Sequence, residues 1–263
     1  MPLPKKETAL ERARATLCAA LAPRNGGSTF NAKTECFTVQ TLNERGAPKT
    51  VRLKGLVPAL RDALYPNFEF TRPAKGGTER APIVGSKPLK KKGTVRAGLA
   101  RGKAVDATIA KCIKTGNFKP SCRATRHVFA ALFKMGLTPV LTQAPVHGMP
   151  KGIRVGTAVD VVCLNTAFQP VLVEIKTGYS NTWDGSNASL CAPLVGIPNS
   201  PRHQHMLQLG ATCELFTMTT GMRPADAFVM RVIASGVEYT RVRPEIQRAM
   251  PAILAMLGRT HHE

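Results

Sequence analysis

Two carboxylates and an amine lie on consecutive apolar segments of the sequence. Asp160 interrupts the apolar run 158–164, and Glu174 and Lys176 flank Ile175 in the next run. Residues two apart on a β-strand share one face, so Glu174 and Lys176 are expected to point the same way. An isolated carboxylate on a strand buried on both faces is costly unless it is paired, hydrogen-bonded or bound to a cation. These three residues are therefore candidates for a functional site.

A short connection between the two segments would set the acids opposite each other. In a simple hairpin centred on Ala167, Asp160 and Glu174 each lie seven residues from the centre. They would then face each other across the ladder, about 5 Å apart at Cβ. Two buried acids at that separation repel strongly unless a positive charge lies between them. A divalent cation would satisfy both, with the backbone carbonyl of Ile175 as a further oxygen ligand, and such ligands suit Mg²⁺ or Mn²⁺.

The expected site has the parts needed to hydrolyse a phosphodiester. A bound divalent metal polarises a phosphate oxygen and lowers the pKa of coordinated water. Lys176 could position or deprotonate the attacking water, or offset charge that develops on phosphorus. The alternative for Asp160, Glu174 and Lys176 is a structural salt-bridge network, which is more usual on polar strands than on apolar ones.

The composition favours a polyanionic partner. The 263 residues include 37 Lys and Arg against 16 Asp and Glu, a formal net charge of +21, and the pI is about 10.3. An excess this large favours DNA, RNA or an anionic membrane surface. No apolar stretch approaches the roughly 20 residues that span a bilayer. A membrane-embedded protein is therefore excluded. The expected partner is a nucleic acid and not a membrane, with DNA, as double-stranded ends or single strands, the leading choice and RNA still open.

The amino-terminal sequence and the cysteines indicate an intracellular, reducing compartment. Residues 1–22 carry charges where a secretory signal would be apolar. The seven cysteines are odd in number and show no C-x-x-C spacing, which argues against a zinc ribbon or an iron–sulfur cluster and favours free thiols. The lysines at 90–92 are compatible with nuclear import, and the chain with a nuclear, viral or phage setting.

Charge and hydrophobic periodicity divide the chain into three parts. Residues 1–70 predict a small basic accessory unit that contains a helix, a hairpin and a second short helix. Residues 71–103 hold ten basic side chains and one acid, Glu79, and are rich in Gly and Pro. That composition indicates a flexible basic linker, which either lies along phosphates or serves solubility alone. Residues 104–263 form the predicted main domain.

The main domain is expected to be an α/β fold of order α-α-β-β-β-α-β-β-α, with helices on both faces of its sheet. The predicted helices and strands are, in order, 104–115, 121–135, 138–145, 156–164, 170–176, 201–219, 227–233, 237–242 and 244–257. A long irregular stretch precedes the helix over 201–219. Tyr179 and Trp183 in that stretch either stack on unpaired bases or anchor the loop by packing.

In this arrangement the chain resembles the PD-(D/E)XK nuclease superfamily, over about residues 102–242. The segment that ends at Asp160 is similar to its Asp motif, and Glu174-Ile-Lys176 is similar to its E-x-K motif. Gln208, on the predicted helix, resembles the Gln motif of the RecB-like and lambda-exonuclease-like branches. A second glutamine one turn earlier, at position 204, competes for that role.

The resemblance implies a restriction-endonuclease-like core, a central mixed sheet of order α-β-β-β-α-β. It implies that Asp160 and Glu174 bind Mg²⁺ or Mn²⁺, that Lys176 is catalytic and that Gln208 orients the site. Asp106 occupies the helical position where those branches have a His or Glu. It is a candidate additional metal ligand, and the alternative is an ordinary charge on the helix surface.

The leading hypothesis is a metal-dependent DNA nuclease that acts in repair, recombination or replication. Features of the RecB-like and lambda-exonuclease-like branches favour an exonuclease over an endonuclease, and an RNA-processing nuclease is a third reading. The alternative from another class is a non-catalytic, basic DNA-binding or packaging protein. That alternative explains the net charge equally well, but it does not explain acids on apolar strands.

Overall fold

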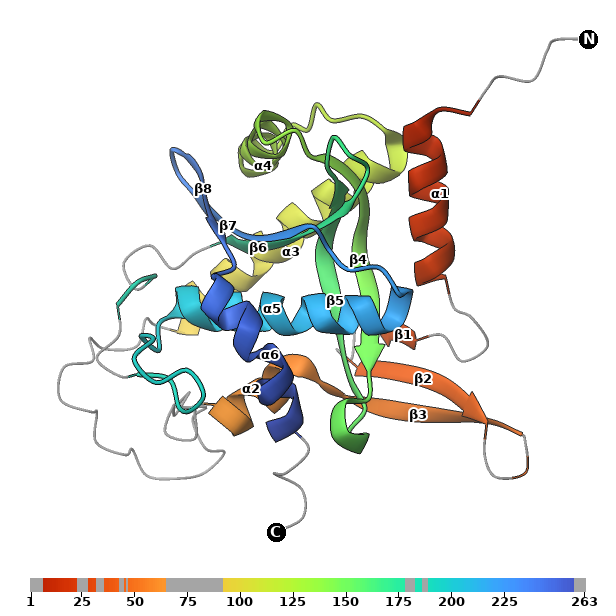
Figure 1. The fold of residues 1–263 in the computed structure, drawn as a ribbon. Helices are drawn as coiled ribbons and strands as arrows, with labels where there is room; N and C mark the ends of the chain where they lie inside the picture. The colour runs from red at the N-terminus through yellow and green to blue at the C-terminus, as the bar shows by residue number, and fades with distance from the viewer. Residues whose placement is uncertain are drawn as a thin grey trace, which may run out of the picture.

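The computed structural model describes residues 7–22, 28–31, 36–42, 45, 47–64, 92–177, 183–185 and 189–257. These residues form an α/β protein with a mixed sheet (Figure 1). The described helices are α1 (Ala9–Leu21), α2 (Leu56–Leu64), α3 (Lys92–Thr115), α4 (Arg123–Lys134), α5 (Pro201–Thr220) and α6 (Pro244–Met256). The described strands are β1 (Ser28–Asn31), β2 (Cys36–Leu42), β3 (Pro48–Gly55), β4 (Thr138–Gly148), β5 (Val155–Leu164), β6 (Pro170–Thr177), β7 (Asp226–Ile233) and β8 (Gly236–Arg241).

Strand β5 is the centre of the sheet. β4 pairs with it antiparallel, β6 pairs antiparallel with its second half, and β3 pairs parallel with its first two residues. The sheet continues on one side through the parallel pair β6–β7 and the antiparallel pair β7–β8. On the other side it continues through β2 to β1, both antiparallel. The order is therefore β1-β2-β3-β5-β6-β7-β8, with β4 paired to β5 off that path.

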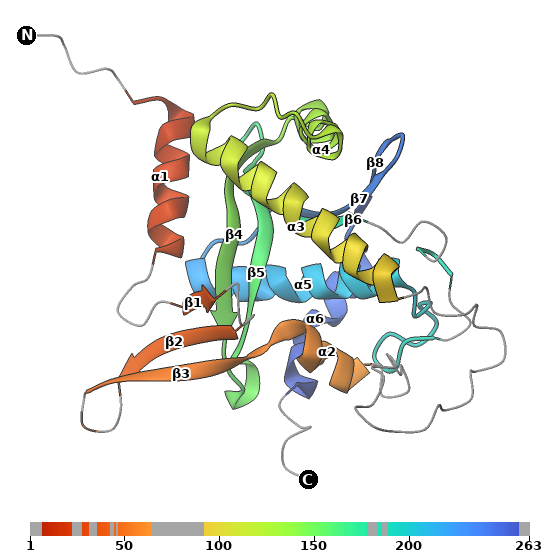
Figure 2. The same cartoon turned by 180° about the vertical axis from the view of Figure 1, so that it is seen from behind.

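Helices cover both faces of the sheet, as Figures 1 and 2 show. α3 and α4 pack on one face, where Val128 and Val173 are fully buried in a shared core. α5, α6, α1 and α2 pack on the other face, where Leu60 and Leu172 are buried. The neighbours Leu172 and Val173 thus point to opposite faces, as the two-residue period of a strand requires. The continuous apolar character of β5 and β6 follows from this double covering.

The described strands before residue 70 belong to the same sheet as the rest, and helices α1 and α2 pack into the core on the α5 face. Leu60 of α2 is buried in the core on the α5 face. Strand β3 approaches β5 so closely that a Cβ added at Gly156 would lie 2.8 Å from Leu53 Cδ1. The predicted boundary between a unit over 1–70 and a domain that starts at 104 therefore does not coincide with a break in the sheet or in the core.

Helix α3 begins earlier than the sequence predicted. The expected helix covered 104–115, whereas α3 starts at Lys92, so residues 92–103 of the predicted linker are helical. Glycines at 93, 98 and 102 lower the helix propensity of this segment and hid it from the sequence pattern. Packing against the sheet stabilises such a helix where propensity alone would not. The remainder of the predicted linker, 71–91, lies outside the described residues.

From α3 to α6 the elements follow the predicted order, so the predicted α/β arrangement is confirmed. The bounds differ by a few residues, and the largest change among the strands is the extension of β4 to Gly148. The ends of α5 have clear local causes. Ser200 caps its first turn through a hydrogen bond from His203 N, and Gly221 ends it at a φ of 74°. Strand β1 was not predicted.

No helix in the described ranges is both long enough and apolar enough to cross a membrane. The six cysteines whose side chains the structure describes are all free thiols. Both findings agree with the sequence, which lacks a long apolar run and any C-x-x-C pair.

Candidate active site at the end of strands β5 and β6

The β5–β6 hairpin has the register that the sequence predicted. Its last ladder pair before the site is Val161 with Val173, and the next pair in this register is Asp160 with Glu174. The backbone pairing of β5 with β6 ends there, because a side-chain oxygen of Asp160 replaces a backbone carbonyl as the acceptor of a hydrogen bond. Asp160 Oδ2 accepts a hydrogen bond from the backbone N–H of Ile175 at 2.8 Å. The two acids are thus brought to one end of the hairpin.

Glu174 is the centre of the site. Its residue is only 2% exposed, although it carries a carboxylate. One oxygen, Oε1, is contacted both by Lys176 Nζ at 2.5 Å and by Gln208 Nε2 at 2.9 Å. The structure therefore brings together three of the predicted site residues. Gln204, the competing glutamine, instead donates to Asn199 Oδ1 at 2.8 Å, and so it is not the glutamine that reaches Glu174.

Helix α3 brings Asp106 toward the same carboxylates. At Gly102 the helix lies so near the end of β6 that an added Cβ would be 3.2 Å from Thr177 Oγ1. One turn later, burial and the charge of Asp160 raise the pKa of Asp106 to about 6, against a smaller lowering by Lys176. Asp106 is half-buried and near enough for the charge of Asp160 to affect its pKa, so its role at the site stays a prediction beside the alternative of a charge on the helix surface.

The site holds more negative charge than positive charge. Burial raises the pKa of Glu174, the charges of Asp160 and then Asp106 raise it further, and Lys176 lowers it. Three mutually coupled carboxylates thus share one ammonium group. Like charges in a poorly solvated place favour protonation or a cation. This excess of negative charge, around a buried Glu174 and the half-buried Asp160 and Asp106, is the property that a divalent ion would relieve.

A divalent ion fits the chemistry of these groups, although the protein does not supply a complete cage. Within the ranges that the structure describes, no three His, Cys, Asp or Glu side chains are grouped closely enough to hold a metal ion. Mg²⁺ is usually bound in enzymes through one or two carboxylates, with waters and substrate phosphates as the other ligands. The paired acids Asp160 and Glu174, with the carbonyl of Ile175, match that kind of open site.

Sequence reasoning missed Gln143, on β4. Its side-chain nitrogen lies 3.3 Å from Asp160 Oδ1, while Ile175 N binds the other oxygen of the same carboxylate. The backbone of Gln143 has a φ of 49°, which is uncommon for a residue other than glycine. Only the β4–β5 pairing reveals this contact, because nothing in the sequence around Gln143 marks it.

Arg231 is a second residue that the sequence did not reveal. In the parallel ladder it is the partner of Lys176, so the two cationic side chains lie side by side on the α5 face. The Arg231 side chain is only 11% exposed, and it forms an ion pair with Glu238 at 3.0 Å. Its guanidinium lies over the ring of Trp183, 5.5 Å from the ring centre.

Trp183 anchors its loop by packing, in agreement with one of the two readings of the sequence. It is 5% exposed, and its ring stacks on that of His205 at 5.8 Å between centroids. A ring enclosed between His205 and Arg231 is not available to stack on a base. Tyr179, the other aromatic residue considered, lies outside the described residues.

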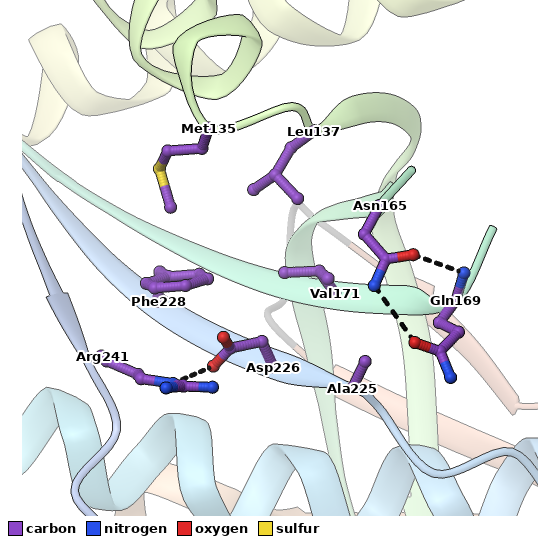
Figure 3. Close-up of a pocket in the computed structure, with 9 residues that line it drawn as sticks. All are labelled: Met135, Leu137, Asn165, Gln169, Val171, Ala225, Asp226, Phe228 and Arg241. Carbon is purple, nitrogen blue, oxygen red and sulfur yellow. Dashed lines mark hydrogen bonds and ion pairs between the residues drawn. The ribbon is translucent and has the colours of Figure 1, made fainter. Parts of the chain in front are cut away.

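A hollow of about 340 Å³ lies at the opposite end of β6 and β7, as Figure 3 shows. Val171 and Phe228 line its floor, and Asp226 and Arg241 meet at its rim, 2.8 Å apart. Its charged groups are thus paired with each other, and it is separate from the carboxylates near Glu174.

Comparisons with known proteins add little. No protein-family model matches the chain, and no curated protein matches it. Among solved structures, one described as the crystal structure of SSO0001 is similar with a TM-score of 0.32 and 14% sequence identity. The match covers 64% of this chain and 64% of that chain, a little under two thirds of its length. At this TM-score the likeness supports no inference about function.

Proposed function

We propose that this protein is a metal-dependent nuclease that hydrolyses phosphodiester bonds in DNA. One observation carries the proposal: Asp160 and Glu174 meet at the end of the β5–β6 hairpin, with Lys176 and Gln208 both in contact with Glu174. A structural salt bridge would need one acid for one amine. A third coupled acid, Asp106, leaves more carboxylates than amines around the buried Glu174, and a structural role does not explain that surplus.

Asp160, Glu174 and the Ile175 carbonyl would hold the metal. Asp106 was a candidate third carboxylate ligand, but no three such side chains are grouped closely enough among the described residues, so it would act only as a nearby charge. The ion, Mg²⁺ or Mn²⁺, would supply Lewis acidity toward a phosphate oxygen and toward water. The two acids are already oriented by protein donors. Asp160 is bonded at both of its oxygens, and such preorganised groups lose little on binding a ligand.

Lys176 is the proposed catalytic group. Its side chain is 21% exposed, so it is held by Glu174 and still reaches solvent. It would orient the attacking water or offset charge at phosphorus. Gln208 would hold the carboxylate of Glu174 in place through its amide N–H. Arg231, beside Lys176 in the sheet, would add positive charge where a phosphate enters.

DNA is the proposed substrate because the chain carries a formal net charge of +21 and therefore attracts polyanions. The resemblance of Asp160, Glu174-x-Lys176 and Gln208 to the motifs of the PD-(D/E)XK superfamily supports the same proposal. Within that superfamily, the Gln motif favours the RecB-like and lambda-exonuclease-like branches, and with them an exonuclease. We also propose that the α/β fold of this protein contains a restriction-endonuclease-like core.

Incubation of the purified protein with linear DNA tests the proposal. Wild type should cleave in Mg²⁺ and not in EDTA, and Asp160→Ala and Lys176→Ala should lose cleavage while they retain DNA binding. Asp226→Asn is a matched control, because Asp226, at the start of β7, also pairs with a cation but lies away from the site. It should cleave as wild type does.

The same assay separates the alternatives. DNA binding without cleavage by any form would support a basic DNA-binding or packaging protein, and equal cleavage by wild type and both site variants would remove the proposed active site. Degradation of linear but not of covalently closed circular DNA would select an exonuclease. Cleavage of both would select an endonuclease, and a preference for RNA would change the substrate class.

A further inference from the structure

The helices on the two faces of the sheet carry very different charge. Helices α3 and α4, which cover one face, hold nine Lys and Arg residues and one acid, Asp106. Helices α1, α2, α5 and α6, which cover the other face, hold five Lys and Arg residues and four acids. Among the helices, the positive charge of the chain is therefore concentrated on the α3–α4 face, where Figure 2 shows α3 crossing in front of the sheet.

Three lysines form a stripe along the outer side of α3. Lys103, Lys111 and Lys114 are all exposed. In an α-helix they lie within about 80° of one another around the axis, and the first and the last are about 16 Å apart along it. Ala104 and Ala107, also exposed, lie on the same stretch of the helix, and their short side chains let a large partner approach closely. This lysine stripe is thus an open, uniformly positive surface.

The lysine stripe begins beside the candidate active site. Lys103 follows Gly102, where α3 lies so near β6 that an added Cβ would be 3.2 Å from Thr177 Oγ1. Thr177 is in turn the residue after Lys176. A partner that lay along the stripe would therefore extend to the end of β6, where Lys176 meets Glu174.

The lysine stripe suits phosphates better than bases. Lysine contacts a phosphate as a point charge, and such contacts fix the position of a nucleic acid without reading its sequence. Sites for single strands combine basic groups with aromatic rings that stack on the bases, and α3 contains no aromatic residue. A stripe about 16 Å long corresponds to about five base pairs of a duplex. Duplex DNA is therefore the favoured partner.

We infer that Lys103, Lys111 and Lys114 bind the phosphate backbone of duplex DNA and direct it along α3 to the end of β6. The inference rests on the proposed nuclease function for its consequence in cleavage, whereas the binding itself does not require cleavage. The competing explanation is that the lysines serve solubility alone. In that case they would matter no more for DNA binding than any other three exposed cations of the chain.

Binding of a short blunt DNA duplex in EDTA, followed by fluorescence anisotropy over a range of salt concentrations, tests the inference without cleavage. The stripe variant replaces all three lysines by glutamine, which keeps their length and removes their charge. At one fixed salt concentration it should bind at least about tenfold more weakly than wild type. The slope of log affinity against log salt should become shallower by about 2 to 3, because each phosphate contact contributes about 0.9 to that slope.

The matched control removes the same charge from the other face. Arg12, Arg14 and Arg248 are exposed on α1 and α6, and their triple replacement by glutamine should lower the affinity less than about threefold and change the slope by less than about 1. Melting temperatures would show that both triple variants are folded. Equal losses of affinity in the stripe variant and the control would show that net charge alone is responsible, and would overturn the inference.

Other partners and the cleavage reaction give further outcomes. Binding of the wild type to vesicles of anionic lipid and not to the duplex, or a larger loss by the stripe variant for a single strand than for the duplex, would overturn the inference. In cleavage, the stripe variant should raise the KM for linear DNA and keep the single-turnover rate at saturating DNA within about threefold. If the wild type bound the duplex and cleaved nothing, the proposed function would fail, and the binding comparison would still decide the inference.

Discussion

Two carboxylate–cation pairs lie at opposite ends of the part of the sheet formed by β6, β7 and β8, and they differ in their surroundings. At the start of β7, Asp226 pairs with Arg241 at 2.8 Å, and the arginine side chain is 67% exposed. Near the end of β6, Glu174 pairs with Lys176, and the carboxylate is 2% exposed. The first pair is one acid and one base at the rim of a hollow (Figure 3).

The difference shows how a pair with a structural role can be distinguished from one proposed to take part in catalysis. Exposed pairs contribute about 0–1 kcal/mol and need no further partners. A buried pair carries a desolvation cost that its own attraction repays only with good geometry and added hydrogen bonds. Glu174 receives such a bond from Gln208, yet it also faces two further acids. Surplus negative charge around a buried carboxylate, more than the pair itself, is what makes this place the candidate site.

The largest expected effect is the loss of cleavage on neutralising Glu174. Glu174→Gln should lower kcat at least about 100-fold, because it removes a metal-binding charge that several kcal/mol of catalysis depend on. Asp226→Asn neutralises the other pair and should change kcat less than about twofold. Single-turnover cleavage of linear DNA in Mg²⁺ measures both. An equal loss of kcat in Glu174→Gln and Asp226→Asn would show that the Glu174–Lys176 pair matters no more for cleavage than the Asp226–Arg241 pair.

A smaller effect is expected from two arginines, Arg231 on β7 and Arg241 on β8. Arg231→Ala should lower kcat/KM about tenfold, because Arg231 lies beside Lys176 and contributes positive charge to the site. Arg241→Ala, which removes the same charge at the other end, should stay within about twofold. Cleavage must be compared at one salt concentration, since both variants lose one positive charge. A matching drop in Arg241→Ala would mean that net charge alone is responsible.

The stability of the metal-free protein should reveal the surplus charge directly. Burial and Asp160 raise the pKa of Asp106 to about 6, above its ordinary value of 3.8. The folded state therefore binds more protons than the unfolded state between these values, and stability falls as the pH rises through that window. In EDTA near pH 8, Asp106→Asn should raise the free energy of unfolding by about 1 kcal/mol, allowing for partial exposure.

Denaturant melts of the wild type and Asp106→Asn near pH 8 and near pH 4 measure this difference. The gain should nearly vanish at the lower pH, where Asp106 is protonated in the folded wild type as well. Added Mg²⁺ should reverse the gain if the wild type binds the ion. A destabilised Asp106→Asn near pH 8 would show that Asp106 is held by favourable contacts and carries no surplus charge.

The smallest expected effect belongs to the exposed pair. Arg241→Ala should lower the free energy of unfolding by less than about 1 kcal/mol, and high salt should remove most of that difference. Thermal melts at low and high salt check it. If the free energy of unfolding fell by several kcal/mol, Asp226 and Arg241 would be needed to hold the start of β7 in place. The pair could then no longer serve as the control for the Glu174–Lys176 pair.

The hairpin and its acids could be predicted because they depend on local rules. A period of two, apolar flanks and a short connection fix which residues face each other, and the observed register followed. Asp106 could not be assigned in the same way, because its role depends on how α3 packs against the end of β6. The sequence also left Gln204 and Gln208 undecided, and the rotation of α5 about its axis settled the choice.

Other contacts of the site were hidden because they join elements that are remote in sequence. Arg231 meets Lys176 only through the β6–β7 ladder, and Gln143 meets Asp160 only through β4. The helical start of α3 was hidden by its glycines. The pairing of β3 with β5 rests on two residue pairs, too few to leave a pattern in the sequence.

The crossover from β6 through α5 to β7 has a consequence for the order of folding. The β5–β6 hairpin brings Asp160 and Glu174 together through local contacts, which form quickly, whereas Gln208 and Arg231 arrive only after a long loop closes. During synthesis on the ribosome, the two acids thus meet before the helix that shields one of them has emerged. The nascent chain would pass through an interval in which its acids are assembled and still hydrated.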